Sequence, residues 1–399
     1  MIKYFNDNYK ILFALRNLKA ILAIFVDSFL VLYFLTLSEN NILPLGIYNL
    51  VAVITVFLSM FLLRNLCKSK TRSNVLRTGI ILDIHFFITI LLLRENVIDH
   101  VILLGFLFGL KEGIYYSVYN SFESDGITNE ERIKYNGQQL ATRAILSVVF
   151  PLIFGGLIAA TGFINSIFFV LIIVIIRILL SFRFKDNNIP KYDKTDLRKF
   201  YSKIKKDRLV KQVYKLSVLN GLTYSFGAFH TIIMVYIIRI FNDSMSLGFF
   251  TSIFSAMTFF IGILFSKHIN PKYHKSIIAI SMPFTIISLV IMVLYPSVLT
   301  VIIFNFYQTI SRNLMTLIND TNIVNISNKP LLKKEYKIEF FLVNDFFLLI
   351  GRVTSQSLFI LMAFISELYI IPIFIIFLVL FTYNAIKLQK LIDKEKQST

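Results

Sequence analysis

Long apolar stretches alternate with short polar ones along the whole chain. A bilayer core of about 30 Å needs about 20 residues of apolar helix to cross it. A segment in lipid must satisfy its own backbone hydrogen bonds, which favours helices over other structures. The pattern predicts twelve helical spans, at residues 19–37, 43–63, 78–93, 101–120, 143–161, 164–182, 216–238, 246–265, 276–294, 297–318, 338–362 and 368–386.

The basic residues fall on one side of these predicted spans. With the N-terminus in the cytoplasm, 35 of the 41 Lys and Arg residues lie in cytoplasmic segments and four lie inside spans. The other two, Arg94 and Arg239, lie near the outer edge. Cytoplasmic loops carry such an excess of Lys and Arg. We therefore predict a multi-pass protein of the cytoplasmic (inner or plasma) membrane with both termini in the cytoplasm.

Composition supports a membrane protein and argues against other classes. The chain is 56% hydrophobic with 41 Phe among 399 residues, and no soluble domain of this length could bury so much apolar surface. The net charge of +18 lies in membrane-flanking loops, which indicates contact with anionic lipid headgroups and no nucleic acid. Cys67 is the only cysteine, which excludes an intrachain disulfide and a cysteine metal cluster. The residue usage, without Trp, is typical of a low-GC bacterium.

A basic connection divides the chain into two halves. Arg183–Lys215 holds 12 Lys and Arg residues and falls after the sixth predicted span. Six spans on each side of a basic linker is the pattern of a duplicated transporter. We predict an N-terminal six-helix bundle over residues 1–182, a cytoplasmic linker over 183–215 and a C-terminal six-helix bundle with a short tail over 216–399. Within the linker, Leu197–Val213 is either a short surface helix or a solvated connection.

The layout and two motifs resemble the major facilitator superfamily. Its loop signature, Gly-x-x-x-Asp-Arg-x-Gly-Arg-Arg, survives in part as Gly262–Lys267, with Ser266 in place of Asp. Pro151-Leu-Ile-Phe-Gly155-Gly156 in span 5 is similar to a signature of proton-coupled exporters, with one extra residue. The resemblance implies an all-α membrane protein with two six-helix bundles around a cavity lined mainly by spans 1, 4, 7 and 10. It also implies a monomer.

Asp27 is the first candidate for proton coupling. Charges within a membrane are costly and usually face a cavity or a partner. Asp27 lies in the middle of span 1 with Phe25, Val26, Phe29 and Leu30 around it in the sequence. A carboxylate in this position could bind and release a proton during transport. The alternative is a structural polar contact with a neighbouring helix.

Span 4 carries a second group of candidates. Lys111 and Glu112 are adjacent, so their side chains point about 100° apart on a helix. We expect one to face the cavity and the other to pair inside the bundle; a local structural ion pair is the alternative. Glu112 is the second proton-coupling candidate, and Lys111 and Tyr115 are substrate-cavity candidates. Four-residue spacing of small residues predicts close helix packing at Gly105, Gly109 and Gly113.

Two further spans present polar faces that we interpret as lining the substrate cavity. Span 10 carries Asn305, Gln308 and Arg312 at positions i, i+3 and i+7. Span 7 carries Asn220, Thr223, Gly227 and His230. His230 could titrate near neutral pH, or it could be a hydrogen-bonded packing residue.

The remaining charges are interpreted as structural. Asp345, Arg352 and Lys267 are assigned to gating or structural roles. Arg177 lies near the inner end of span 6, where its side chain could extend to the interface. Asp83 in span 3 is expected to support the loop between spans 2 and 3.

The sequence therefore predicts a secondary active transporter that moves a small organic, amphipathic solute by alternating access. Asp27 and the span 5 motif favour export coupled to inward proton flow. Two alternatives remain: a transporter or flippase for a lipid-linked or peptide substrate, and a non-transporting membrane sensor or scaffold. The sequence has no Walker A, His-Glu-x-x-His or Gly-x-Ser-x-Gly motif, so we predict no enzyme, no cofactor and no metal site.

Overall fold

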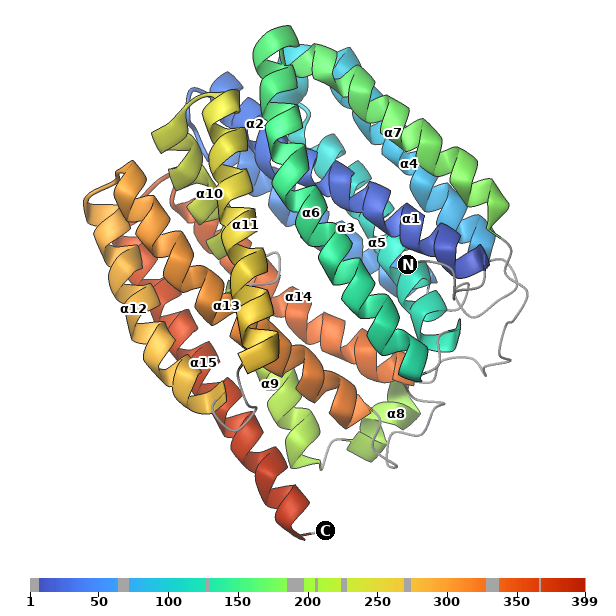
Figure 1. Cartoon of the computed structure of the whole chain (residues 1–399), viewed down its shortest axis with the longest axis vertical. Helices are drawn as coiled ribbons and strands as arrows, with labels where there is room; N and C mark the ends of the chain where they lie inside the picture. Colours follow the sequence, from blue (N-terminus) through green and yellow to red (C-terminus); the bar gives the residue numbers. More distant parts are fainter. Residues whose placement is uncertain are drawn as a thin grey trace. The chain divides into compact units, whose positions relative to one another are not determined.

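A computed structural model describes residues 7–63, 72–126, 129–184, 197–204, 207–223, 228–268, 274–327, 337–365 and 367–398, and over these residues the fold is all-helical (Figure 1). The helices in chain order are α1 (Asp7–Ile24), η1 (Phe25–Leu30, a π-helix), α2 (Val31–Leu37), α3 (Leu43–Leu63), α4 (Arg72–Leu93), η3 (Arg94–Ile98, a 3₁₀-helix), α5 (Val101–Gly126), α6 (Asn129–Thr161), α7 (Phe163–Arg183), α8 (Leu197–Ile204), α9 (Arg208–Thr223), α10 (Ala228–Phe241), α11 (Ser244–His268), α12 (His274–Leu294), α13 (Val298–Ser327), α14 (Lys337–Leu361) and α15 (Glu367–Ser398).

The predicted all-α membrane fold is confirmed, whereas the exact number of spans stays a prediction. Among the described residues, nine helical segments are long and apolar enough to cross a membrane. They are Lys10–Leu37, Leu43–Leu63, Ser73–Ile98, Val101–Tyr119, Gln138–Thr161, Phe163–Arg183, Arg208–Phe241, Ser244–Ile263 and Tyr369–Ile392. Ala279–Leu294 is a shorter apolar helix.

The chain divides into two compact units. Unit 1 is Met1–Tyr192 with Phe241–Ala256, and unit 2 is Asp193–Ile240 with Met257–Thr399. The helix α8 forms within the predicted linker and buries Phe200 and Ile204. The domain boundaries at residues 182 and 215 stay a prediction.

Glycines set the closest helix contacts in unit 1. A Cβ atom at Gly105, Gly109 or Gly113 on α5 would lie only 2.4–2.6 Å from a backbone carbonyl oxygen of α3. The predicted close packing at this glycine repeat is therefore confirmed. Unit 2 also has a close helix contact at glycine. A Cβ at Gly221 on α9 would lie 2.3 Å from the Leu348 carbonyl oxygen on α14, and Gly351 faces Gly221.

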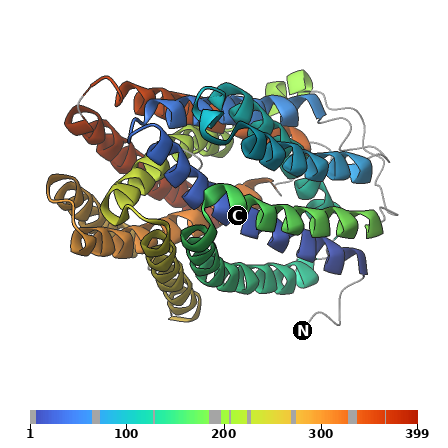
Figure 2. The same ribbon diagram turned by 90° about the horizontal axis from the view of Figure 1, so that it is seen from above.

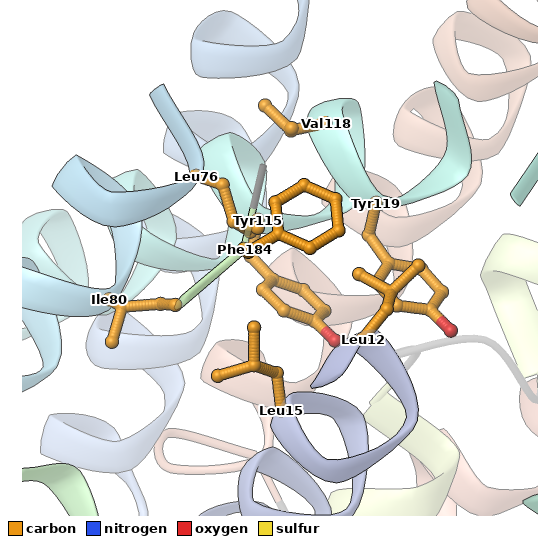
Figure 3. Packing of buried hydrophobic residues seen from close by; sticks show 8 residues of the cluster. All are labelled: Leu12, Leu15, Leu76, Ile80, Tyr115, Val118, Tyr119 and Phe184. Atoms are coloured by element: carbon orange, nitrogen blue, oxygen red, sulfur yellow. The ribbon is translucent and has the colours of Figure 1, made fainter. Parts of the chain in front are cut away.

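The first helix has neighbours on two sides in unit 1. Helix α1 lies between α6 and α7 and packs on both (Figures 1 and 2). At its N-terminal half, α1 contributes to an apolar cluster with α4, α5 and the residue that follows α7 (Figure 3). The cluster consists of Leu12, Leu15, Leu76, Ile80, Tyr115, Val118, Tyr119 and Phe184. This packing holds α1 against α5, where the charged residues of both helices meet.

Candidate functional site

Five buried charged side chains form one network inside unit 1. The Lys19 ammonium on α1 donates to Glu112 Oε2 on α5 at 2.6 Å. Lys111 on α5 lies 3.5 Å from Glu112 Oε1 and donates to Asp83 Oδ1 on α4 at 3.0 Å. Arg177 Nη1 on α7 donates to the other oxygen of Asp83. Each of these side chains is at most 11% exposed, so the network ties four helices together away from water.

Aromatic rings complete the surroundings of the cations. Lys19 Nζ lies 3.7 Å from the ring centroid of Tyr115 and 3.9 Å from that of Tyr116. Arg177 Cζ lies 5.1 Å from the Tyr115 ring, and Lys111 Nζ lies 4.7 Å from the Phe108 ring. Cations are attracted to the faces of such rings. Rings and carboxylates thus replace part of the hydration that the cations lose on burial.

This arrangement bears on several sequence-based expectations. Lys111 and Glu112 are both buried and lie 3.5 Å apart, which fits the local structural ion pair that was the alternative to one of them facing a cavity. The prediction that Arg177 extends to the interface is wrong, because its side chain is 2% exposed and paired with Asp83. Asp83 likewise pairs inside the bundle rather than only supporting a loop. Lys19 was not recognised as part of a site, although its position as the first residue of the first predicted span was a signal.

Asp27 lies in a different local environment. It belongs to the π-helix η1, in which it is exposed, whereas the other five residues are buried: Phe25, Val26, Ser28, Phe29 and Leu30. A π-helical turn within an α-helix is rare and is often found at functional sites. The break in α-helical geometry therefore coincides with the residue that the sequence singled out for proton coupling.

The predicted cavity residues of unit 2 divide into buried and accessible groups. Asn305 and Gln308 on α13 are buried, and the Asn305 amide donates to the Val301 carbonyl of its own helix at 2.9 Å. Arg312, two turns further along α13, is exposed. The polar face predicted on α13 thus has an interior part and a surface part.

The other candidates in unit 2 vary in the same way. Thr223 is buried and donates to the Leu219 carbonyl at 2.9 Å, whereas Asn220 is half-buried and His230 on α10 is exposed. Asp345 and Arg352 on α14 are half-buried. Gly227 and the side chain of Lys267 lie outside the described part of the structure. Among the described residues, no group of three or more His, Cys, Asp or Glu side chains is placed to hold a metal ion.

Comparison with known proteins decides the family. Residues 18–323 match the family model described as Major Facilitator Superfamily. The chain belongs to the major facilitator superfamily. The chain is also 22% identical over 344 residues to the uncharacterized protein YqgE of Bacillus subtilis (strain 168), covering 85% of this chain and 79% of YqgE.

Solved structures of superfamily transporters share the fold. A bacterial homologue of the iron transporter ferroportin in the inward-facing state has a TM-score of 0.66 at 14% identity, covering 96% of this chain and 98% of the other. The human organic anion transporter MFSD10 has a TM-score of 0.62 at 11% identity, with coverages of 94% and 98%. A bacterial metal transporter has a TM-score of 0.60 at 12% identity, with coverages of 97% and 100%.

These findings establish the general class of the protein. It is a multi-pass membrane protein and a secondary transporter of a small-molecule solute, and it is not an enzyme. The first of these structures is described as a homologue of an iron transporter and the third as a metal transporter, whereas MFSD10 is described as an organic anion transporter, so the shared fold does not select a substrate.

Proposed function

We propose that this transporter exports a small amphipathic organic solute in exchange for protons, and that Asp27 is the carboxylate that binds the proton. The observation that carries the proposal is the exposed carboxylate of Asp27 on the π-helix η1 of the first span. Its exposure distinguishes Asp27 from the carboxylates of the buried charge network, whose protonation would disrupt that network. Protonation also removes a charge whose presence in the membrane is costly.

Glu112 is the weaker of the two proton-coupling candidates. Its carboxylate accepts a hydrogen bond from Lys19 at 2.6 Å and lies 3.5 Å from Lys111. A proton arriving at Glu112 would have to displace these cations and would leave them buried without their partner. We therefore assign the coupling proton to Asp27 and a structural role to the Glu112 pair.

The solute class follows from the aromatic character of the interior around the first span. Phe25 packs against Phe154 and Phe163 with ring centroids 5.1 and 5.3 Å apart. Such surfaces favour solutes with a large apolar part over sugars, which need many polar side chains. We place the protein in the cytoplasmic membrane as a monomer with both termini in the cytoplasm, in accord with the distribution of its basic residues.

The proposal is tested with purified protein in liposomes. Ethidium serves as the amphipathic probe, and its movement is followed by fluorescence with and without an imposed pH gradient, while a trapped dye reports proton flux. Wild type is expected to move ethidium faster when an imposed pH gradient drives protons in the opposite direction, and the trapped dye should report protons moving down their gradient, opposite to ethidium. Asp27→Asn is expected to retain ethidium exchange but to lose the response to the gradient.

Asp99→Asn is the matched control, because Asp99 is an exposed carboxylate in the connection between η3 and α5. It should respond to the gradient as wild type does. Proton coupling at Asp27 is wrong if Asp27→Asn responds as strongly as wild type, or if neither protein responds. The assignment of the solute class is wrong if amphipathic probes are not moved and a polar solute is.

A further inference from the structure

The buried network of unit 1 carries more positive than negative charge. Among the described residues, it contains three cations, Lys19, Lys111 and Arg177, and two carboxylates, Asp83 and Glu112. Each carboxylate already contacts two of the cations. A buried charge without a counter-charge is strongly unfavourable in a protein interior, and more so within a membrane. The network therefore calls for one further negative charge.

Two polar atoms beside the network have no hydrogen-bond partner among the described residues. They are the hydroxyl oxygen of Tyr115 and Nε of Arg177. Both side chains are buried, with exposures of 4% for Tyr115 and 2% for Arg177. Buried polar groups almost always have a partner, so each such exception requires an explanation. Both groups carry a hydrogen to donate, so each requires an acceptor.

The excess charge and the unpartnered donors lie at the same place. The Tyr115 ring has Lys19 Nζ 3.7 Å from its centroid and Arg177 Cζ 5.1 Å from it. Tyr115 is thus in contact with two of the three cations and carries one of the two unpartnered donors. The nearest carboxylates, Glu112 and Asp83, are occupied by their own cations.

We propose that unit 1 binds one monovalent anionic group beside Tyr115, held by Lys19, Arg177 and the Tyr115 hydroxyl. Its single negative charge balances the network, and its lone pairs accept the hydrogens of Arg177 Nε and Tyr115. A chloride ion and a carboxylate group share this chemistry. The site is a property of unit 1 and does not depend on proton coupling at Asp27.

The site is tested by thermal unfolding of the full-length protein in detergent. Sodium gluconate, whose anion is bulky, is replaced stepwise by sodium chloride or sodium acetate at constant ionic strength and pH 7. A ligand that binds only the folded state raises the unfolding midpoint in a saturable way. Wild type is expected to show this rise. Saturation by chloride identifies a free ion as the ligand, and saturation by acetate alone identifies a carboxylate.

Two variants change the excess charge in opposite directions. Lys19→Gln leaves two cations and two carboxylates, and it is expected to weaken anion binding by about tenfold or more. Glu112→Gln raises the excess to two, and it is expected to strengthen binding by a similar factor. Opposite shifts in affinity cannot arise from a general loss of stability. Arg183→Gln is the control, since Arg183 is an exposed cation at the end of the same helix as Arg177.

Three results would overturn the site. Wild type could fail to respond to either anion, in which case water or a rearrangement satisfies the donors. The two variants could bind the anion with wild-type affinity, which would place the ion elsewhere. Raising the pH from 7 to 9 could stabilise wild type while the anions have no effect, and the excess charge would then be removed by loss of a proton from Lys19.

Discussion

The two units join their helices with different polar chemistry. In unit 1, ion pairs connect α1, α4, α5 and α7 through the buried network around Glu112 and Asp83. In unit 2, several hydrogen bonds between helices in the described residues join hydroxyl and amide side chains. Examples are Ser217 to Asn344 at 2.5 Å, Gln212 to Asn384 at 3.1 Å and Thr285 to Ser311 at 2.7 Å.

Both units also use close glycine contacts, between α3 and α5 in unit 1 and between α9 and α14 in unit 2. Replacing a buried ion pair by apolar residues is often neutral or stabilising. The excess positive charge of unit 1 is therefore better explained by the proposed anion site than by the stability of the fold.

The largest expected effect comes from breaking the network at Asp83. Asp83→Asn leaves Arg177 buried without its carboxylate and removes one partner of Lys111. Removing one member of a buried ion pair destabilises a protein by roughly 3–5 kcal/mol, because the remaining charge stays buried. The loss is measured as the difference in the free energy of unfolding between wild type and Asp83→Asn, each titrated with SDS in mixed detergent micelles. The exposed Asp99 provides the control, as Asp99→Asn should change stability by less than about 0.5 kcal/mol. A loss below about 1 kcal/mol for Asp83→Asn would mean that the network can rearrange freely.

The glycine contacts test what the two units have in common. A Cβ at Gly109 would lie 2.4 Å from the Ala52 carbonyl oxygen in unit 1, and one at Gly351 would lie 2.0 Å from the Val218 carbonyl oxygen in unit 2. Gly109→Ala and Gly351→Ala should each cost roughly 1–3 kcal/mol, because backbone must move to make room. Gly156→Ala is the control, since nothing lies within 4 Å of its added Cβ. It should be neutral or stabilising by up to about 1 kcal/mol, and the same SDS titration measures all three. A large loss in one unit alone would refute a shared mode of packing.

These examples also show what the sequence could reveal. The all-helical membrane fold and the glycine contacts were predictable because each follows from a pattern along a single helix: the length of the apolar stretches in the first case and a four-residue repeat in the second. The partners of Lys111 and Glu112 were not, because they depend on how α1, α4 and α7 are rotated toward α5. Adjacent residues differ by about 100° around a helix. A small error in the predicted rotation of a helix therefore places a side chain toward lipid when it lies in the interior, or the reverse.

Depth along a helix limited the prediction in unit 2. Asn305 and Arg312 share a face of α13, as their seven-residue spacing requires, yet Asn305 is buried and Arg312 is exposed. Periodicity gives the direction of a side chain around the helix axis, but not what surrounds it two turns further along. Arg177 was misinterpreted for the related reason that its distance from the end of α7 suggested an interfacial position.

A smaller effect is expected at the start of α11, in the segment Phe241–Ala256 that belongs to unit 1. Asp243 accepts a hydrogen bond from the Ser246 backbone N–H at 2.8 Å and caps this helix. Hydrogen bonds from the Ser246 hydroxyl and N–H lower the pKa of Asp243. The ionised Asp243 carboxylate therefore stabilises the folded protein at pH values above the ordinary pKa of an aspartate. This stabilisation is lost as the pH falls through the lowered pKa of the folded state. Asp243→Ala should cost about 1 kcal/mol at pH 7 and less in acid, whereas Asp243→Asn, which keeps a capping oxygen, should cost less at pH 7. Unfolding midpoints at pH 7 and pH 3 test this, and an equal loss at both values would contradict it.

The smallest effect is expected in the neutral contacts of unit 2. Ser217 donates to Asn344 across α9 and α14, but its hydroxyl is also within 3.0 Å of the Val213 carbonyl of its own helix. Because the hydroxyl keeps this second acceptor, loss of the contact between the helices should cost only about 0.6 kcal/mol, the average for such bonds in membrane proteins. A double-mutant cycle with Ser217→Ala and Asn344→Ala isolates the coupling energy, and a parallel cycle with Asp83→Asn and Arg177→Gln gives the value for unit 1. The contrast between the units requires the ionic coupling to be several times larger. If the two couplings are equal, the charges of unit 1 act as ordinary polar contacts and no functional reason for them is needed.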